Sequence, residues 1–270
     1  MESKLIDQYA IEFYGQMRTC DKCGDLRLQN CFLYTQEEEC TTFPHCKLGS
    51  FDYYPPEFAF IGQDYTQTTP KVLFLAQIPY WTLENVAEWE QGHSAYAVPQ
   101  HNQYSEFLGA YRMDFAEYAI VGKKFGILDI CSAIFDLPKS QDLLERITYT
   151  NAAKCPNRSG SERNPNDGYN ANQSTSDIAT MVANCRENLN TEIHILNPDV
   201  ILSFDRAFLP AIEKQAGGKS KDGISLSMSI AGQERLIISF FHPSMAGVNY
   251  AKAKISFGDR IRIIRDFMQK

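Results

Sequence analysis

A carboxamide and a thiol, two side chains with distinct binding chemistry, stand close together near the middle of the chain. Residues 147–157 read ITYTNAAKCPN, so a run rich in β-branched residues ends in Asn151, and Cys155 follows four residues later. Sites in α/β proteins form at the carboxyl ends of parallel strands. The pattern therefore predicts a binding site at Asn151, whose amide can donate and accept hydrogen bonds, and a metal ligand at Cys155. The alternative for Asn151 is a strand-end amide that caps backbone groups.

Cysteines supply the second kind of chemistry. The chain has eight of them, and Cys20 and Cys23 form a CxxC motif. Because no secretory signal is visible, thiols or metal ligands are expected rather than disulfides. Cys185 falls on the apolar stripe of a predicted helix, so a buried core thiol is its alternative. A further group, Cys31, Cys40, His45 and Cys46, fits no standard zinc spacing and is interpreted as plain thiols, with a zinc site as the alternative.

The composition allows a full apolar core in one large domain or two small ones. The chain has 270 residues, 44% of them apolar, and a formal net charge of −7. No apolar run approaches the ~20 residues of a membrane helix. With no signal peptide visible either, we expect a cytoplasmic protein without a membrane partner. The negative charge argues against a general nucleic-acid coat, although a local basic groove is compatible with it.

The elements that must position these side chains alternate between strands and helices. Short apolar runs predict buried strands at 71–76, 147–150, 199–204 and 236–241. Helical spacing predicts helices at 3–17, 82–92, 103–119, 126–135 and 206–215. Another helix is predicted along the apolar stripe from Ile178 to Leu196, after a cap at Thr175 or Ser176. The terminal segment is also predicted to be a helix, with Ile261, Ile264 and Phe267 facing inward. This order predicts an open, mainly parallel sheet with helices on both faces. Three strands end at residues 77–80, at Asn151 and at His242, which would then share one rim.

A polar segment, residues 156–176, follows the central motif. It is rich in Asn, Ser, Gly and Arg and is predicted to be a loop. Loops of this length are usually functional or disordered. Arg158, Arg163 and Tyr169 would suit an arm over a nucleic acid, and the alternative is a solvated loop.

Taken in order, these motifs resemble the uracil-DNA glycosylase superfamily, most closely its iron–sulfur-containing bacterial and archaeal branch. The resemblance runs from Cys20 nearly to the C-terminus. It is carried by the CxxC motif and by residues 60–64, the proline-containing loop 76–81, the segment 92–98, the helix 126–137, the motif TNAAKC at 150–155, Cys185 and the His-Pro-Ser motif at 242–244. The agreement in order is more specific than any single motif.

The resemblance implies a three-layer α/β/α fold around a central, mainly parallel four-stranded sheet. The glycosylase-like domain would span 59–270, with an N-terminal helix and cysteine-rich extension, 1–58, packed on it. The implied activity is that of a DNA N-glycosylase in base-excision repair. Such an enzyme hydrolyses the N-glycosidic bond of an extruded uracil or modified pyrimidine and leaves an abasic site. Its partner would be DNA, duplex or single-stranded, and the protein would act as a monomer.

The resemblance also implies roles for individual residues. His242 would stabilise the charge on the departing base, Gln77 would position water, and Asn151 would read the base edge. The remaining substrate-binding residues would be Tyr96, which stacks on the base, and Ile78, Pro79, Tyr80 and Ser244. Ordinary packing is the alternative for Tyr96, and a structural hydrogen bond is the alternative for His242. A loop from 244 to 249 would enter the minor groove, with Lys252 and Lys254 available for phosphates.

Four cysteines match the ligands of a [4Fe–4S] cluster in the branch that this chain resembles. They are Cys20, Cys23, Cys155 and Cys185. Such a cluster needs four converging thiolates, which can come from distant segments. Zinc is the alternative, because a CxxC motif serves either metal. A surplus cysteine could also replace one of the four.

The catalytic loop departs from the family. The positions of the two family carboxylates hold Ile78 and Gln77, so neither acid is present. Orientation of water by Gln77 could suffice, or another acid, Asp64, Glu84 or Asp129, could act instead. Three other functions stay open: a glycosylase that acts on hypermodified phage bases in antiviral defence, a modified-base-binding protein without catalysis, and a metal-stabilised scaffold.

Overall fold

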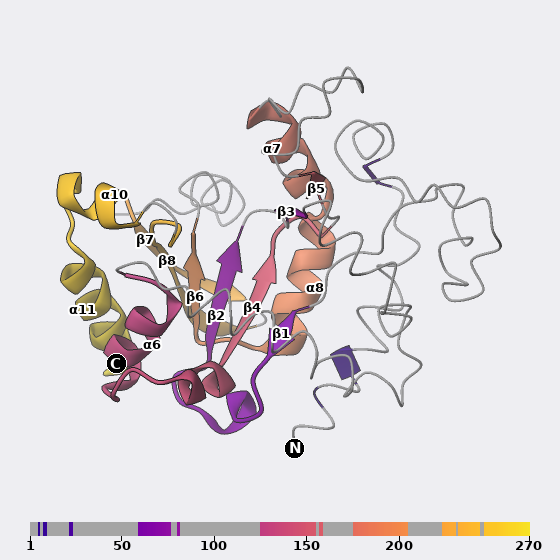
Figure 1. The fold of residues 1–270 in the computed structure, drawn as a ribbon. Helices are drawn as coiled ribbons and strands as arrows, with labels where there is room; N and C mark the ends of the chain where they lie inside the picture. The colour runs from indigo at the N-terminus through magenta and orange to yellow at the C-terminus, as the bar shows by residue number, and fades with distance from the viewer. Residues whose placement is uncertain are drawn as a thin grey trace, which may run out of the picture.

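The computed structural model describes residues 59–76, 125–154, 175–204, 223–230, 232–243 and 246–270, with short pieces at 5, 8, 9, 22, 23, 80–81 and 157–158. In these residues the chain forms a mixed α/β structure around a six-stranded sheet (Figure 1). None of the described helices is both long and apolar enough to cross a lipid bilayer.

The sheet contains all four predicted strands and two more. Its order is β1-β4-β2-β6-β8-β7. The inner strands β4, β2, β6 and β8 are parallel to one another, whereas the edge strands β1 and β7 pair antiparallel with β4 and β8. The bounds are β1 Phe60–Ile61, β2 Val72–Ala76, β4 Ile147–Asn151, β6 Val200–Ser203, β7 Ser225–Ile230 and β8 Gln233–Ser239. The sheet is therefore mixed, with a parallel centre, and has six strands where the sequence predicted four.

The inner strands are buried on both faces, which explains their unbroken apolar runs. Alternate residues of β2 point to opposite sides, so Phe74 joins one apolar cluster and Leu73 joins the other. Leu202 and Ile201 of β6 divide in the same way. Strands covered on both faces carry mostly apolar or β-branched side chains, as parallel strands between helix layers do.

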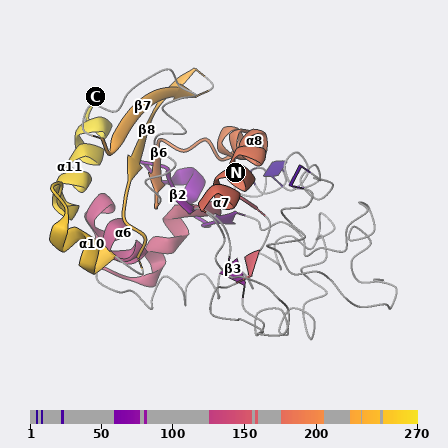
Figure 2. The ribbon, with the colours of Figure 1, turned by 90° about the horizontal axis from the view of Figure 1, so that it is seen from above.

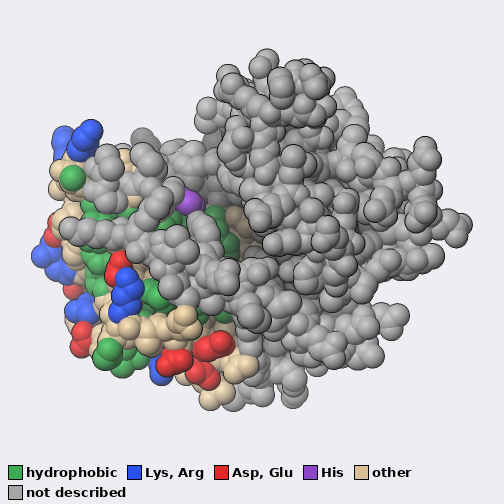
Figure 3. Space-filling view, in the orientation of Figure 1, with side chains coloured by type: hydrophobic (Ala, Val, Ile, Leu, Met, Phe, Trp, Pro, Cys, Tyr) green, Lys and Arg blue, Asp and Glu red, His purple; other side chains and the backbone are tan. Residues whose placement is uncertain are grey.

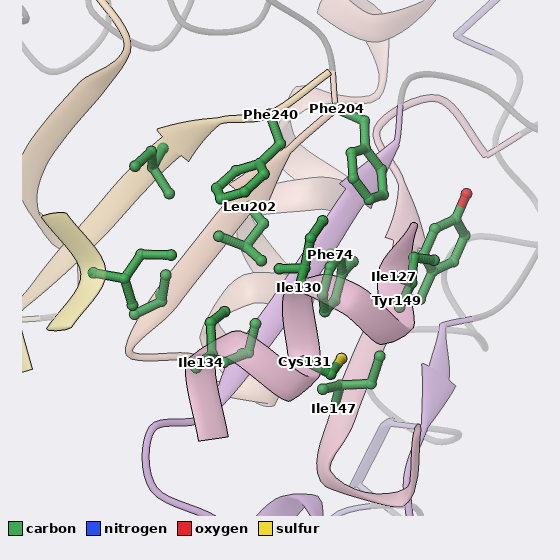
Figure 4. Close-up of a cluster of buried hydrophobic side chains, with 14 of the residues drawn as sticks. Phe74, Ile127, Ile130, Cys131, Ile134, Ile147, Tyr149, Leu202, Phe204 and Phe240 are labelled. Atoms are coloured by element: carbon green, nitrogen blue, oxygen red, sulfur yellow. The ribbon is translucent and has the colours of Figure 1, made fainter. Parts of the chain in front are cut away.

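One face is covered by α6 (Ile127–Phe135), α10 (Ala246–Lys252) and α11 (Phe257–Met268), as Figure 2 shows. Ile130 and Ile134 of α6 point toward Leu202 and Phe240 in the same apolar cluster (Figure 4). Predicted helix 126–135 is thus confirmed. The terminal helix is confirmed too, with Ile261, Ile264 and Phe267 packed against this cluster.

The other face is covered by α7 (Thr175–Asn184) and α8 (Arg186–Leu196). The predicted continuous stripe is interrupted at Cys185, which is a turn residue and caps α8. Its backbone still continues the helical pattern, because Cys185 N donates to Met181 O at 3.0 Å and Leu189 N donates to Cys185 O at 2.9 Å. The break is therefore slight, and the stripe still faces the sheet.

Strand β7 was not predicted, although its sequence carries a signal. Residues 225–230 read SLSMSI, an alternation of serine and apolar residues with the period of a strand. It pairs with β8 in a hairpin whose turn includes Gly232, at a φ of 78°. A left-handed φ of this kind favours glycine. β8 is also longer than predicted at its start and ends at Ser239 instead of residue 241.

Two predicted loops are partly regular structure. Residues 246–249 belong to α10, so the prediction of a loop over 244–249 is wrong for that part. In the predicted loop 156–176, residues 157–158 form β5 (Asn157–Arg158), which pairs with β3 (Tyr80–Trp81) in a separate two-stranded sheet. Thr175 and Ser176 already belong to α7 instead of capping it. Backbone pairing and helix ends of this kind depend on neighbours that a local reading cannot see.

The turn between β1 and β2 needs a glycine. Gly62 N donates to Ile147 O at 2.9 Å, and a Cβ on Gly62 would come within 2.4 Å of the Glu145 backbone. Only glycine allows such a close approach of two backbones. This turn leads through the short helix η2 (Tyr65–Gln67) into β2, while η4 (Gln141–Arg146) leads into β4.

Some predicted elements lie outside the described residues. They are the helices at 82–92, 103–119 and 206–215. Of the predicted helix 3–17, the structure describes Leu5, Gln8 and Tyr9, and all three have helical backbone. Tyr9 is fully buried against the face that α8 covers. The domain division after residue 58 stays a prediction.

Candidate functional site

The register of the parallel strands brings their carboxyl ends to one edge of the sheet. Ala76, the last residue of β2, lies opposite Asn151, the last residue of β4. Ser203 of β6 lies opposite Ser239 of β8. The predicted common rim is therefore confirmed for the strand ends that the structure describes, including those that lead into residue 77 and into His242.

Asn151 is held at this edge by the strand and by the turn that follows it. The side chain is buried, with 4% of its surface exposed. The next residue, Ala152, donates its backbone N–H to Ala76 O at 2.9 Å, so the chain stays against β2 as it leaves the sheet. A polar amide that is almost fully enclosed beside the start of another loop can take part in specific recognition.

His242 lies three residues after β8 and is half-buried. Its ring packs edge-on against Phe204, with the centroids 5.9 Å apart, and Phe204 in turn packs against Phe74 of β2. An imidazole at this place can present a hydrogen-bond donor at the carboxyl edge.

A buried arginine fixes the segment that carries His242. Arg260 of α11 donates to the backbone carbonyl of Ser239, the last residue of β8. Its guanidinium lies 5.0 Å from the ring centroid of Phe241 and 5.6 Å from that of Tyr250. A planar cation between aromatic rings gains both packing and electrostatic attraction. Arg260 therefore holds Ser239 and Phe241, which precede His242, and Tyr250, which follows it.

The structure brings together two of the four predicted metal ligands. Cys23 and Cys185 are both buried, at 5% and 3% exposure. The side-chain amide of Asn184 donates to Lys22 O at 3.0 Å and lies 3.8 Å from the Cys23 sulfur. The Lys22 ammonium pairs with Glu187 at the start of α8. These contacts hold the CxxC end of the N-terminal segment against the junction of α7 and α8.

The pKa of the Cys185 thiol is raised above its ordinary value, first by a hydrogen bond with Cys23 and then by burial. The backbone of Lys154 is also hydrogen-bonded to Cys185 and lowers that pKa, as does the Lys154 charge. Lys154 directly precedes Cys155 in the sequence. Two thiols and the residue next to a third thus meet at one place.

Cys23 and Cys185 are two of the four thiolates that the resemblance implies, and the complete four-thiolate site stays a prediction. Cys155 adjoins Lys154, and Cys20 belongs to the same CxxC motif as Cys23, although both lie outside the described residues. Iron–sulfur clusters and zinc both accept four thiolates, so the arrangement suits either. Among the residues described, no group of three or more His, Cys, Asp or Glu could hold a metal ion without those two cysteines.

Several predicted site residues lie outside the described part of the chain. They are Gln77, Ile78, Pro79, Glu84, Tyr96 and Ser244, together with the surplus group Cys31, Cys40, His45 and Cys46. For Tyr80 the structure describes only the backbone, in β3. Their placement at the site stays a prediction.

Two of the acids that could replace the missing loop carboxylates, Asp64 and Asp129, make contacts away from the rim or within their own helix. Asp64 N donates to Glu145 O at 2.7 Å, before the start of β4, so Asp64 lies at the amino edge, opposite the rim that holds Asn151. The carboxylate of Asp129 caps α6 by accepting from Gly126 N at 3.1 Å and pairs with Lys139 at 2.8 Å. Asp64 is thus a wrong candidate, and Asp129 is engaged in supporting its helix.

Sequence reasoning missed the polar residues that support the site, Arg260 and Glu192. Glu192 is fully buried although it is acidic. A signal was present, because Glu192 falls between Leu189 and Leu196 on the apolar stripe of its helix. A charged residue on such a stripe indicates a buried partner elsewhere in the chain.

A comparison with protein-family models and another with curated proteins found no match to this sequence. The resemblance described above therefore rests on the order of motifs along the chain.

Proposed function

We propose that this protein is a DNA glycosylase of the uracil-DNA glycosylase type, with a three-layer α/β/α fold. It would hydrolyse the N-glycosidic bond of an extruded uracil or modified pyrimidine and leave an abasic site. The observation that carries the proposal is the buried amide of Asn151 at the carboxyl edge, opposite Ala76, from which the proline-containing loop begins. The motif order along the chain supports the same function.

In this proposal the target base leaves the helical stack before reaction, because its glycosidic bond is otherwise enclosed. Asn151 reads the base edge with one donor and one acceptor, and Tyr96 stacks on its ring. The C–N bond breaks with its electron pair going to the base, and His242 donates a hydrogen bond to the oxygen where negative charge develops. Water oriented by Gln77 adds to the sugar carbon, and the proton that it loses neutralises the departing base, so one water supplies both products.

Exposed basic residues support a DNA partner despite the negative net charge. Lys252 at the end of α10 and Lys254 just beyond it are exposed, and they follow the His242 segment in the chain. Figure 3 shows Lys and Arg side chains, with Asp and Glu side chains among them, on the side of the molecule where α10 and α11 lie. Local positive charge determines phosphate binding more than net charge does.

The cysteine site would support the fold of the enzyme. Cys20, Cys23, Cys155 and Cys185 would hold a [4Fe–4S] cluster, with zinc as the alternative occupant. A bound metal group would cross-link the N-terminal segment to the α7–α8 junction and to the turn after β4. An absorbance spectrum and an iron count of anaerobically purified protein distinguish cluster from zinc, since only the cluster absorbs visible light.

The decisive experiment incubates the purified protein with duplexes that carry uracil or 5-modified cytosine and scores abasic sites by alkaline cleavage. We expect cleavage of at least one substrate and a loss of about 100-fold or more in rate for His242→Ala, the size expected for one leaving-group donor. Lys139→Ala, at an exposed lysine before η4, which leads into the amino end of β4, is the matched control and should keep the wild-type rate. No cleavage of any such base by the metal-loaded protein would reject the enzyme.

A second candidate function, binding of a modified base without catalysis, is favoured by the missing acids of the catalytic loop. Neither carboxylate of the family loop is present, Asp64 lies at the opposite edge, and Asp129 caps a helix. Tight binding without turnover, weakened by Asn151→Ala, would select this function. Duplexes with hypermodified bases test the related proposal of a glycosylase in antiviral defence.

A further inference from the structure

A buried ion pair beneath the end of β4 takes no part in the reaction proposed above. Lys154 Nζ and the Glu192 carboxylate form the pair, and both side chains have 0% of their surface exposed. Burial of two charges is unfavourable unless hydrogen bonds satisfy both groups. The pair therefore needs further partners, and it has them.

The Glu192 carboxylate joins several segments of the chain. Its Oε1 accepts from the Tyr9 hydroxyl at 2.6 Å, and the Thr150 hydroxyl lies 3.0 Å from Oε1 and 3.1 Å from Oε2. Lys154 Nζ donates to Glu192 Oε2 and to Thr150 Oγ1. The Tyr9 hydroxyl accepts from Ala59 N at 2.8 Å. One carboxylate of α8 thus holds β4, the turn after it and the N-terminal segment.

Lys154 is the side chain by which that turn is anchored. The turn consists of Ala152, Ala153 and Lys154, all with 0% exposure. Alanines have no polar side chain, so only Lys154 can tie the turn to α8 through a side-chain hydrogen bond. Asn151 stands at one end of this turn, and at the other end the Lys154 backbone is hydrogen-bonded to Cys185.

We propose that Lys154 and Glu192 are positioning residues that fix the turn 152–154 and thereby set both the Asn151 amide and the thiol site at Cys185. The Asn151 half of this inference rests on the proposed function, whereas the thiol half does not. The two sites are therefore linked through a single buried pair, and its loss should disturb both of them.

The test uses the full-length protein as purified and three variants: Lys154→Met, Glu192→Gln and the double variant Lys154→Met/Glu192→Leu. Three quantities are measured: the melting temperature, and, at a temperature well below it, the rate at which N-ethylmaleimide labels Cys185, read by peptide mass spectrometry, and the Kd for a uracil-containing duplex. We expect labelling and Kd each to rise at least about tenfold in all three variants, the size of a modest positioning effect.

The double variant separates positioning from simple stabilisation. Apolar replacement of a buried ion pair is often neutral for stability. We expect the double variant to regain most of the melting temperature lost in the single variants, while labelling and Kd stay raised. Recovery of all three quantities together would overturn the inference, because the pair would then serve the fold alone.

The matched control is Arg235→Met, which removes an equally buried cation at the amino end of the sheet. Arg235 is 1% exposed, donates to Pro198 O, and lies 2.6 Å from Asn197 Oδ1. It should lower the melting temperature and leave Cys185 labelling unchanged. Equal labelling in Arg235→Met and Glu192→Gln would indicate general loosening and contradict the inference.

Two further outcomes remain decisive. If Glu192→Gln fails to fold, Tyr9→Phe removes one hydrogen bond to the same carboxylate, and we expect a smaller rise in labelling; an unchanged rate would contradict the inference. If the wild-type protein binds no duplex, the proposed function fails. The labelling rates of Cys185 then decide the inference by themselves.

Discussion

Individual side chains at the carboxyl edge depend on buried polar neighbours for their orientation. His242 is half-buried against Phe204, and the backbone before it is held by Arg260 through the Ser239 carbonyl and the ring of Phe241. Arginine suits this place because its flat guanidinium can donate hydrogen bonds and stack on rings at the same time, which a lysine ammonium cannot do. The orientation of His242 should therefore depend on the shape of residue 260 as well as on its charge.

We predict that Arg260→Lys lowers kcat for base excision by about tenfold with little change in KM, because a misplaced donor loses transition-state stabilisation and not ground-state binding. Steady-state kinetics on the preferred substrate measure both constants. Arg262→Lys, at an exposed neighbour on the same helix, should behave like the wild type. A rise in KM at constant kcat would show that Arg260 supports binding instead.

Helix α11 is stabilised at its start by a capping motif that can be recognised in the sequence. At the start of α11, Asp259 N donates to the Ser256 hydroxyl at 3.1 Å, and Ser256 N donates to Asp259 Oδ2 at 3.1 Å. This reciprocal pair is a capping box, which satisfies backbone donors at the first turn. The hydrogen bonds from the Ser256 side chain and backbone lower the pKa of the Asp259 carboxyl.

This pKa shift predicts a pH-dependent contribution of α11 to stability. Because the pKa of Asp259 is lower in the folded than in the unfolded protein, its contribution is present above the unfolded value and is lost as pH falls through the folded value. Asp259→Asn should thus lower the melting temperature near neutral pH, and the difference from wild type should shrink in acid. Thermal unfolding over a pH series measures it, and a constant difference would contradict the assignment.

The molecule as a whole combines a net charge of −7 with exposed lysines beyond the rim. Lys252 is the last residue of α10 and Lys254 lies two residues beyond it, and both are exposed. In the sequence they follow the segment that contains His242. Lys139 precedes η4, which leads into the amino end of β4, so it belongs to the other edge. Replacement of a lysine that contacts a DNA phosphate should weaken the dependence of DNA affinity on salt, whereas replacement of a lysine elsewhere should not.

We predict that Lys252→Ala and Lys254→Ala each reduce the slope of log K against log salt by about 1 for DNA binding, because each removes one phosphate contact and its counterion release. Binding titrations at several salt concentrations measure this slope. Lys139→Ala should leave it unchanged. Equal effects for all three lysines would mean that the affinity reflects overall charge and not a defined DNA path.

Much of the fold was predictable because it follows from local patterns. Runs of apolar and β-branched residues identified all four inner strands, since a strand covered on both faces has no polar side. The helical spacing of apolar residues identified α6 and α11, because each helix buries one apolar face against the sheet. The edge strands were not predicted: β1 is two residues long, and β7 alternates serine with single apolar residues and so lacks the apolar run of the inner strands.

The sequence by itself determined which segments become the parallel strands, because side-chain burial repeats with the period of each element. The tertiary structure places Cys23 beside Cys185, which only the resemblance had implied, and it alone decided that Lys154 meets Glu192. These pairs join segments far apart along the chain, and no local pattern encodes such a distance. Their contact results from how the helices pack on the sheet, where a buried charge or thiol is stable only beside a partner that another segment supplies.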